Sequence, residues 1–273
     1  MNTKISVFGG TGFVGSVFCK KYSDSIIIGR NETQPATNNI LYLISTVDNY
    51  NVLTNPHIDI ETNLVHLMNV LENCKDIDAT FTFISSWFVY GKTELPANEN
   101  SICNPKGFYS ITKHTAEQLV ESYCKTFDIK YKIIRLGNVV GKSDNKVSKK
   151  KNALQFLLSE IKSNNKINLY NEGQFYRDYI DVEDVADGIK FIIDNGENSE
   201  VYNLASGVPI LFKDIIDYAY NQLNSTSEIG VMEPTNFHKL VQVESMYLDT
   251  TKLNNLGFKP SKNIHQIIDN LIK

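Results

Sequence analysis

Short apolar runs alternate, along the first two thirds of the chain, with longer segments in which apolar residues recur at helical spacing. In residues 58–74, for example, Leu64, Leu67, Met68 and Leu71 fall on one face of a helix. Buried strands that alternate with helices are typical of a parallel sheet covered on both faces. The predicted strands are 4–8, 25–28, 40–44, 79–84, 131–136 and 201–204, and the predicted helices between them are 13–22, 58–74, 109–127 and 182–195.

The pattern changes after Gly141. A predicted helix at 153–162 is followed by short β-type runs at 167–170 and 176–180, and the last predicted helix is 264–272. Asp181 stands directly before helix 182–195 and is a suitable N-cap. We therefore predict an α/β fold in which a doubly wound parallel sheet carries a smaller C-terminal mixed α/β lobe. The sheet domain is expected to comprise 1–141 and about 181–205, and the lobe 142–180 and 206–273.

Three glycines lie between the first predicted strand and the first predicted helix. Gly9 permits a tight turn, Gly12 lets a pyrophosphate approach the backbone, and Gly15 lets the helix pack close to the strand. Phosphate charge then meets the free N–H groups at the helix N-terminus. The pattern predicts a Rossmann-like dinucleotide site, formed by Gly9, Thr11, Gly12, Phe13, Val14 and Gly15.

The residues after the second predicted strand bear on which dinucleotide is bound. An acidic residue there would hydrogen-bond the adenosine ribose and repel a 2′-phosphate, whereas an arginine would pair with that phosphate. The sequence has Arg30 at this place and no acid before Glu32. We therefore favour NADP(H), while Glu32 keeps NAD(H) as an alternative.

Tyr109 and Lys113 stand four residues apart in a predicted helix and so share one face of it. A lysine ammonium beside a phenol favours the phenolate, so we expect the pKa of Tyr109 to be lowered, which suits proton transfer. Upstream, the apolar strand 79–84 runs into Ser85 and Ser86. Ligands lie beyond the carboxyl ends of parallel strands, where Ser86 can hydrogen-bond a substrate oxygen beside the tyrosine.

Composition adds mainly exclusions. Hydrophobic residues make up 42% of the 273 residues and the net charge is −4, which gives no reason to expect a nucleic-acid or membrane partner. The basic run 146–151 is expected to be a solvated loop. Four scattered cysteines are expected to be small core residues in a cytoplasmic protein, and neither they nor the five histidines predict a metal site.

Several motifs together resemble the extended short-chain dehydrogenase/reductase family of nucleotide-sugar epimerases, dehydratases and ketoreductases. They follow one another in the family's order along nearly the whole chain: 9–15, Asn63 within 61–64, 85–91, 109–113, 135–141, 177–182 and 249–260. The resemblance implies an NAD(P)-dependent oxidoreductase whose partner is a nucleotide-diphosphate sugar. It also implies a homodimer held together by helices near 61–74 and 109–126.

The same resemblance assigns roles to individual residues. Tyr109 takes the place of the general acid/base, Lys113 that of its helper and ribose ligand, and Ser86 that of the catalytic Ser/Thr. Asn138 and Arg177 fall where the family holds the nucleotide diphosphate; an ion pair with a nearby carboxylate is the alternative role for Arg177. Ser45, Asn63 and Ser85 complete the expected cofactor-binding set, and Trp87 is expected to line the sugar side.

Departures from the family pattern narrow the reaction. Dehydratases of this family carry an acidic pair directly after the catalytic Ser/Thr, whereas this chain has Trp87 and Phe88, which cannot transfer that proton. The cysteine and histidine used for double epimerisation are also not found near Ser86 and after Gly141. We therefore expect NADPH-dependent reduction of a nucleotide-linked 4-keto-6-deoxy sugar. NAD-dependent 4-epimerisation is the alternative, and a cofactor-binding regulatory protein without activity is a third.

Overall fold

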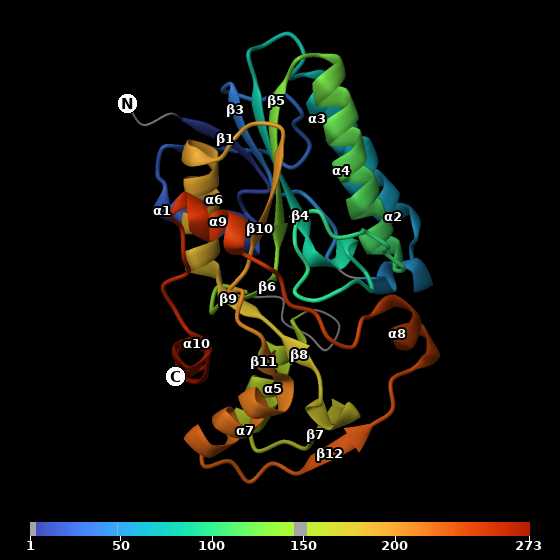
Figure 1. Cartoon of the computed structure of the whole chain (residues 1–273), viewed down its shortest axis with the longest axis vertical. Coiled ribbons are helices and arrows are strands. Elements are labelled where there is room, and N and C mark those ends of the chain that lie inside the picture. Colours follow the sequence, from blue (N-terminus) through green and yellow to red (C-terminus); the bar gives the residue numbers. More distant parts are fainter. Residues whose placement is uncertain (1–3, 48, 145–151) are drawn as a thin grey trace.

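A six-stranded sheet forms the upper part of the molecule in the computed structural model, which describes residues 4–47, 49–144 and 152–273 (Figure 1). Its strands run parallel in the order β10-β5-β4-β3-β1-β2, as the alternating pattern predicts. The chain passes from β1 outward to β2 and then back across β1 to β3, so the topological switch point lies between β1 and β3. Ligands of such sheets bind beyond the carboxyl ends at this point. The strand bounds are β1 (Ile5–Phe8), β2 (Ser25–Ile28), β3 (Asn39–Tyr42), β4 (Thr80–Ser86), β5 (Lys130–Leu136) and β10 (Glu200–Leu204).

Helices cover both faces of the sheet (Figure 1). One face packs against α1 (Phe13–Lys21) and α6 (Val182–Asn195), and the other against α3 (His66–Glu72) and α4 (Phe108–Thr126). The two apolar cores that result cover the sheet on both sides, with Val7 and Leu41 among the strand residues that are fully buried. The predicted cap of α6 is confirmed, because the Asp181 carboxylate accepts a hydrogen bond from the Glu183 amide at 2.9 Å.

The helix predicted at 58–74 is interrupted. It consists of α2 (His57–Ile60), a π-helical turn η2 (Glu61–Val65) and α3. Such turns often lie at functional sites because they redirect a side chain from the helical stripe. Here the redirected residue is Asn63, whose contacts are described with the site.

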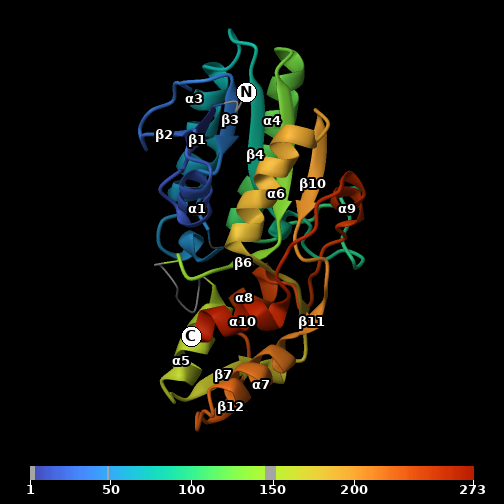
Figure 2. The ribbon, with the colours of Figure 1, turned by 90° about the vertical axis from the view of Figure 1, so that its left-hand side faces the viewer.

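A smaller lobe lies below the sheet (Figure 1). Figure 2 shows the molecule turned about its vertical axis, with the same lobe below the sheet. Leu158, Ile216 and Ile268 of three helices share an apolar core there with β7. The predicted strand 176–180 is broken at Asp178, whose buried carboxylate accepts a hydrogen bond from the Leu248 amide at 3.1 Å. The lobe contains α5 (Ala153–Lys162), α7 (Phe212–Gln222), α8 (Asn236–Val241), α10 (Ile264–Ile272) and the strand pairs β6 (Asn138–Val140) with β9 (Tyr179–Asp181), β7 (Ile167–Tyr170) with β12 (Ile229–Met232), and β8 (Tyr176–Arg177) with β11 (Ile210–Leu211). Short 3-10 turns are η1 (Asn49–Leu53), η3 (Trp87–Val89) and η4 (Asn171–Gly173).

Two segments depart from the expected division into sheet domain and lobe. Strand β6 falls in the range 1–141, yet it pairs with β9 in the lobe. Helix α9 (Thr251–Leu256) falls in the range 206–273, yet Leu253 packs into the core beneath the sheet. The reason is a long-range contact that periodicity does not encode: the Lys252 ammonium binds the Val201 carbonyl of β10 at 2.6 Å. The remaining boundaries of the division stay predictions.

Three other expectations concern surface and composition. The basic run 146–151 lies outside the described residues. Helices α3 and α4 lie side by side, and Val65 and Ile111 are exposed there, but the dimer stays a prediction. Cys74 and Cys124 are buried, as expected of core residues, while Cys19 and Cys103 are half-buried. Among the described helices, none combines the length and apolarity needed to cross a membrane.

Candidate active site

A cavity of about 1030 Å³ opens at the carboxyl ends of β1, β3, β4 and β5 and is walled on its other side by the lobe. Every residue expected to act on cofactor or substrate lines this cavity, with the exception of Asn63. The predicted residues on the wall are Gly9, Thr11, Gly12, Phe13, Val14, Gly15, Arg30, Ser45, Ser85, Ser86, Trp87, Tyr109, Lys113, Asn138 and Arg177.

The glycine turn has the geometry that its spacing predicts. Gly9 has a φ of +85°, a left-handed conformation that glycine adopts without strain. The Gly12 amide closes the turn on the Gly9 carbonyl at 3.0 Å, and Gly12 is the N-cap of α1. A Cβ on Gly15 would lie 2.3 Å from the Gly9 carbonyl oxygen, so only glycine lets α1 begin this close to β1. The first turn of α1 carries no acidic residue, which leaves its N-terminus open to a phosphate.

Arg30 and Glu32 occupy different places after β2. Arg30 is exposed and lines the cavity. The Glu32 carboxylate instead folds back on Gly29, where a Cβ would lie 2.8 Å from Glu32 Oε1, and Glu32 is not part of the cavity wall. Of the two side chains that bear on cofactor choice, the cationic one therefore faces the cavity. Residues 29–38, all described, contain no helix.

Tyr109 and Lys113 lie one turn apart on α4 and are 8% and 2% exposed, respectively. Ser86 ends β4, beside Leu136 of β5. The hydroxyl groups of Ser86 and Ser45 lie near the Tyr109 phenol and act to lower its pKa. The Phe88 ring packs edge-on against Tyr109, with 5.9 Å between ring centroids. The cavity thus places two hydroxyl groups at one buried phenol.

Burial dominates the charge state of this group of residues. It raises the pKa of Tyr109 to about 12, and Ser86 and Ser45 oppose that rise only in part. The pKa of Tyr109 is therefore raised in this structure, and the expectation that it is lowered is wrong, because burial outweighs the groups that favour the phenolate. The Lys113 ammonium instead donates to the Ile84 carbonyl at 2.6 Å and lies 4.2 Å from the centroid of the Phe83 ring. At neutral pH the phenol keeps its proton and is poised to act as an acid.

Asn63 supports the cavity wall from behind. Its carboxamide oxygen accepts from the Ser45 hydroxyl at 3.0 Å and from the Thr46 amide at 2.9 Å. Its nitrogen donates to Thr112 on α4 at 2.9 Å. The side chain is buried and joins the loop after β3 to the helix that carries Tyr109. Asn63 therefore positions Ser45, and it does not face the cavity.

On the lobe side, Asn138 and Arg177 are fixed by backbone carbonyls. Asn138 donates to the Asp178 carbonyl at 3.0 Å. Arg177 donates to the carbonyls of Val243 and Glu244 at 2.8 and 2.6 Å, and its guanidinium lies 4.8 Å from the Phe175 ring centroid. Arg177 thus binds backbone carbonyls, and these contacts do not include the ion pair with a carboxylate that was its alternative role. Its positive charge is held rigidly at the cavity wall.

Trp87 also lines the cavity, where its ring stacks on Phe88 with 3.8 Å between centroids. Both side chains follow Ser86 directly, and neither carries a group that can exchange a proton. The stack presents a flat apolar surface next to the hydroxyl groups of Ser86 and Tyr109.

The lobe contributes a wall residue, His238, that the sequence did not predict. His238 of α8 lines the cavity, and its Nδ1 lies 3.1 Å from the Tyr50 hydroxyl of η1. The His238 ring also packs on Tyr170, with 4.4 Å between centroids. Helix α8 is too short to give a periodic signal; its only marker was the Thr235 cap, whose hydroxyl accepts from the His238 amide. Tyr50 and His238 connect the two lobes across the cavity.

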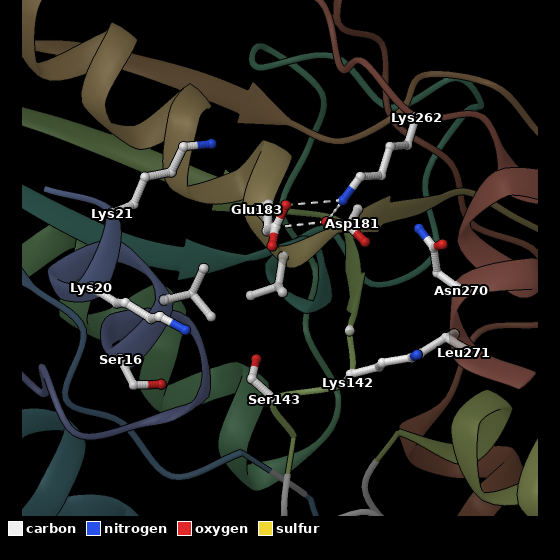
Figure 3. Close-up of a pocket in the computed structure, with 13 residues that line it drawn as sticks. Ser16, Lys20, Lys21, Lys142, Ser143, Asp181, Glu183, Lys262, Asn270 and Leu271 are labelled. Carbon is white, nitrogen blue, oxygen red and sulfur yellow. Dashed lines mark hydrogen bonds and ion pairs between the residues drawn. The ribbon is translucent and has the colours of Figure 1, made fainter. Parts of the chain in front are cut away.

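A second cavity, of about 770 Å³, lies between α1, the start of α6 and α10 (Figure 3). Four lysines line it: Lys20 and Lys21 of α1, and Lys142 and Lys262 of two loops. Lys262 is paired with Asp181 at 2.7 Å and with Glu183 at 3.2 Å. Ser16 and Ser143 line both cavities. None of the predicted site residues lies on this wall, so the chemistry belongs to the larger cavity. Among the described residues, no group of three His, Cys, Asp or Glu side chains is arranged to hold a metal ion.

Comparison with known proteins places this architecture in a family. The model of the NAD dependent epimerase/dehydratase family matches residues 40–205, more than half of the chain. The dTDP-4-dehydro-6-deoxyglucose reductase of Escherichia coli is 25% identical over 79% of this chain and 66% of that protein.

Solved structures agree with this match. A UDP-glucose 4-epimerase from Thermotoga maritima, with UDP-glucose, has a TM-score of 0.87 at 20% identity and covers 98% of this chain and 97% of its own. RMD from Pseudomonas aeruginosa, complexed with NADPH, has a TM-score of 0.85 at 20% identity, with 99% and 98% covered. The chain therefore belongs to the NAD dependent epimerase/dehydratase family of extended short-chain dehydrogenases/reductases and is an NAD(P)-dependent enzyme.

Proposed function

We propose that the enzyme uses NADPH to reduce the keto group of a nucleotide-linked 4-keto-6-deoxy sugar. The observation that carries the proposal is a buried, protonated phenol with a serine hydroxyl beside it, in a cavity whose adenosine end is lined by an arginine. Similarity to the reductase of Escherichia coli supports the substrate class. The Trp87–Phe88 stack in place of acidic side chains weighs against dehydration.

The glycine turn and Lys113 would hold the cofactor, whose nicotinamide would supply a hydride to the carbonyl carbon. Ser86 donates a hydrogen bond to the substrate carbonyl, which polarises it and fixes its orientation beside Tyr109. The Tyr109 phenol then gives its proton to the oxygen that becomes negative, a transfer that a positioned acid accelerates by about 10²–10⁴-fold. Lys113 stabilises the phenolate that remains and binds ribose hydroxyls. Arg177 and Asn138 hold the nucleotide diphosphate, since a guanidinium suits phosphate.

NAD-dependent 4-epimerisation is the second candidate, and similarity to a putative UDP-glucose 4-epimerase of Methanocaldococcus jannaschii, 24% identical over 98% of this chain, supports it. Two assays separate the two reactions. With a dTDP-linked 4-keto-6-deoxy sugar, the reductase consumes one NADPH for each alcohol formed. An epimerase interconverts UDP-sugar epimers with no net consumption of added cofactor. Epimer formation without NADPH consumption would overturn the reductase proposal. Activity in neither assay would favour the third hypothesis, a cofactor-binding regulatory protein.

Arg30→Ala should weaken NADPH binding and leave NADH binding nearly unchanged. A lost charge-assisted contact to the 2′-phosphate is worth roughly 1.5–3 kcal/mol, so we expect the Kd for NADPH to rise by about 10–100-fold. Titration of nicotinamide fluorescence measures both affinities. Glu32→Gln is the matched variant: if it weakens NADH binding while Arg30→Ala changes nothing, the enzyme is adapted to NAD.

A further inference from the structure

A buried ion pair lies directly behind the proposed catalytic residues. Tyr109, Lys113 and Glu117 follow one another at four-residue intervals on α4, so they form one stripe that faces the sheet. Arg135 of β5 binds both oxygens of Glu117, Nε to Oε1 at 3.0 Å and Nη2 to Oε2 at 2.8 Å. The Glu117 and Arg135 side chains are 6% and 7% exposed. A buried pair of this kind rarely adds net stability, because desolvation of both charges offsets their attraction.

Arg135 is held from several sides. It donates to the Glu99 carbonyl at 3.1 Å, and its guanidinium lies 4.7 Å from the Tyr90 ring centroid. The Tyr90 hydroxyl in turn donates to Asn203 of β10 at 2.7 Å. These contacts fix the charge of Arg135, and with it that of Glu117, relative to the strand ends that carry the site.

We propose that the Glu117–Arg135 pair is a positioning device for the reaction, in which Glu117 keeps Lys113 cationic beside Tyr109 and Arg135 limits how strongly it does so. The proposal rests on the role of Lys113 in the proposed function. It gives the stripe a simple order: Tyr109 handles the proton, Lys113 stabilises the phenolate, and Glu117 stabilises Lys113.

The surroundings of Lys113 leave Glu117 as its main source of negative charge. Strand β4 presents to it the neutral Ile84 carbonyl and the Phe83 ring. Strand β5 contributes Arg135, whose charge is paired with Glu117. Helix α2 contributes Asp59, whose negative charge raises the pKa of Tyr109.

Burial lowers the pKa of Lys113 to about 7, and the Glu117 charge opposes that fall. Burial would raise the pKa of Glu117 itself, but the two hydrogen bonds from Arg135 and the nearby His114 ring, 3.6 Å away at Nδ1, outweigh it and lower that pKa. The protonation of Lys113 is thus balanced near neutral pH.

Two substitutions should move the pKa of Lys113 in opposite directions. Glu117→Gln removes the negative charge and keeps a hydrogen-bond acceptor for Arg135, so the pKa of Lys113 should fall by about one unit. Arg135→Gln removes the cation that binds both oxygens of Glu117, so the Glu117 charge acts more strongly on Lys113 and the pKa of Lys113 should rise. Loss of packing alone would lower kcat in both variants without moving their pH profiles apart.

The test titrates lysine side chains by NMR in protein labelled at lysine 15Nζ and 13Cε, with the Lys113 signal assigned by its loss in Lys113→Met. The basic limb of the kcat profile should follow the NMR pKa, to lower pH in Glu117→Gln and to higher pH in Arg135→Gln. Glu121→Gln, which breaks an exposed pair with Lys125 one turn further along α4, should move neither. If the Lys113 signal titrates alike in all variants, the proposal is wrong, whatever the enzyme's substrate. If the signals shift as expected but the reductase assay is negative, the proposed reaction fails and the coupling stands.

Discussion

Tyr109→Phe is expected to lower kcat by roughly 10³-fold with little change in the KM for the sugar, because only the proton transfer is lost. The ring that packs against Phe88 is kept, so the fold should be unaffected. Loss of one buried hydroxyl near Ser86 and Ser45 should cost only about 1 kcal/mol of stability. Steady-state kinetics with the keto sugar, together with urea denaturation, measure both effects.

Tyr123→Phe is the matched control for this substitution. Tyr123 lies on the same helix, where its ring packs on Phe127 far from the cavity, and its hydroxyl should be dispensable. A Tyr109→Phe variant that turns over within a few-fold of the wild type would remove Tyr109 from the mechanism. The proton would then have to come from Ser86 or from solvent.

Lys113→Met is expected to abolish activity and yet make the protein more stable at neutral pH. The unfolded lysine binds its proton up to its usual pKa of 10.5, while the folded one releases it above about 7. Between these values the unfolded state binds more protons, so the wild type gains stability as pH rises. Deleting the ammonium removes this dependence. Linkage sets the upper limit of the gain in the free energy of unfolding at about 4 kcal/mol at pH 7 and about 2 kcal/mol at pH 9, from which the lost Ile84 hydrogen bond subtracts.

Urea denaturation at the two pH values gives the comparison. Lys125→Met, on the exposed side of the same helix, should leave stability nearly unchanged at both. If Lys113→Met is less stable than the wild type at pH 7, then the Ile84 contact outweighs the cost of burying the charge. Stability bought by deleting a functional charge is a common trade at active sites.

The elements that could be predicted from the sequence are those whose own residues carry the signal, as an apolar run, a helical period or a cap. The β2 and α5 bounds follow from continuous or periodic apolar runs, and α6 from its Asp181 cap. By contrast, β11 has two residues and exists because Ile210 pairs with the distant Arg177. The break at Asp178 depends in the same way on Leu248, a contact 70 residues away. Pairings of this range leave no periodic signal.

The candidate site was predictable in membership more than in chemistry. Spacing and motif order bring Ser86, Tyr109 and Lys113 to one cavity. The sign of the Tyr109 pKa shift was not predictable, because it depends on how completely the rest of the chain excludes water from the phenol. Asn63 was expected to bind the cofactor, but it lies behind the cavity wall, in the π-helical turn, and contacts Ser45. His238 comes from a helix that sequence periodicity cannot reveal.

The contact between Tyr50 and His238 has a practical consequence for ligand discovery. Because the walls of the cavity come from residues as distant as Gly9 and Gln242, a compound that touches both walls holds together segments from nearly the full length of the chain. Occupancy at a hundred times Kd would raise the unfolding free energy by about 2.7 kcal/mol. Melting-temperature shifts against a panel of nucleotide sugars can thus identify the physiological ligand before any turnover assay exists.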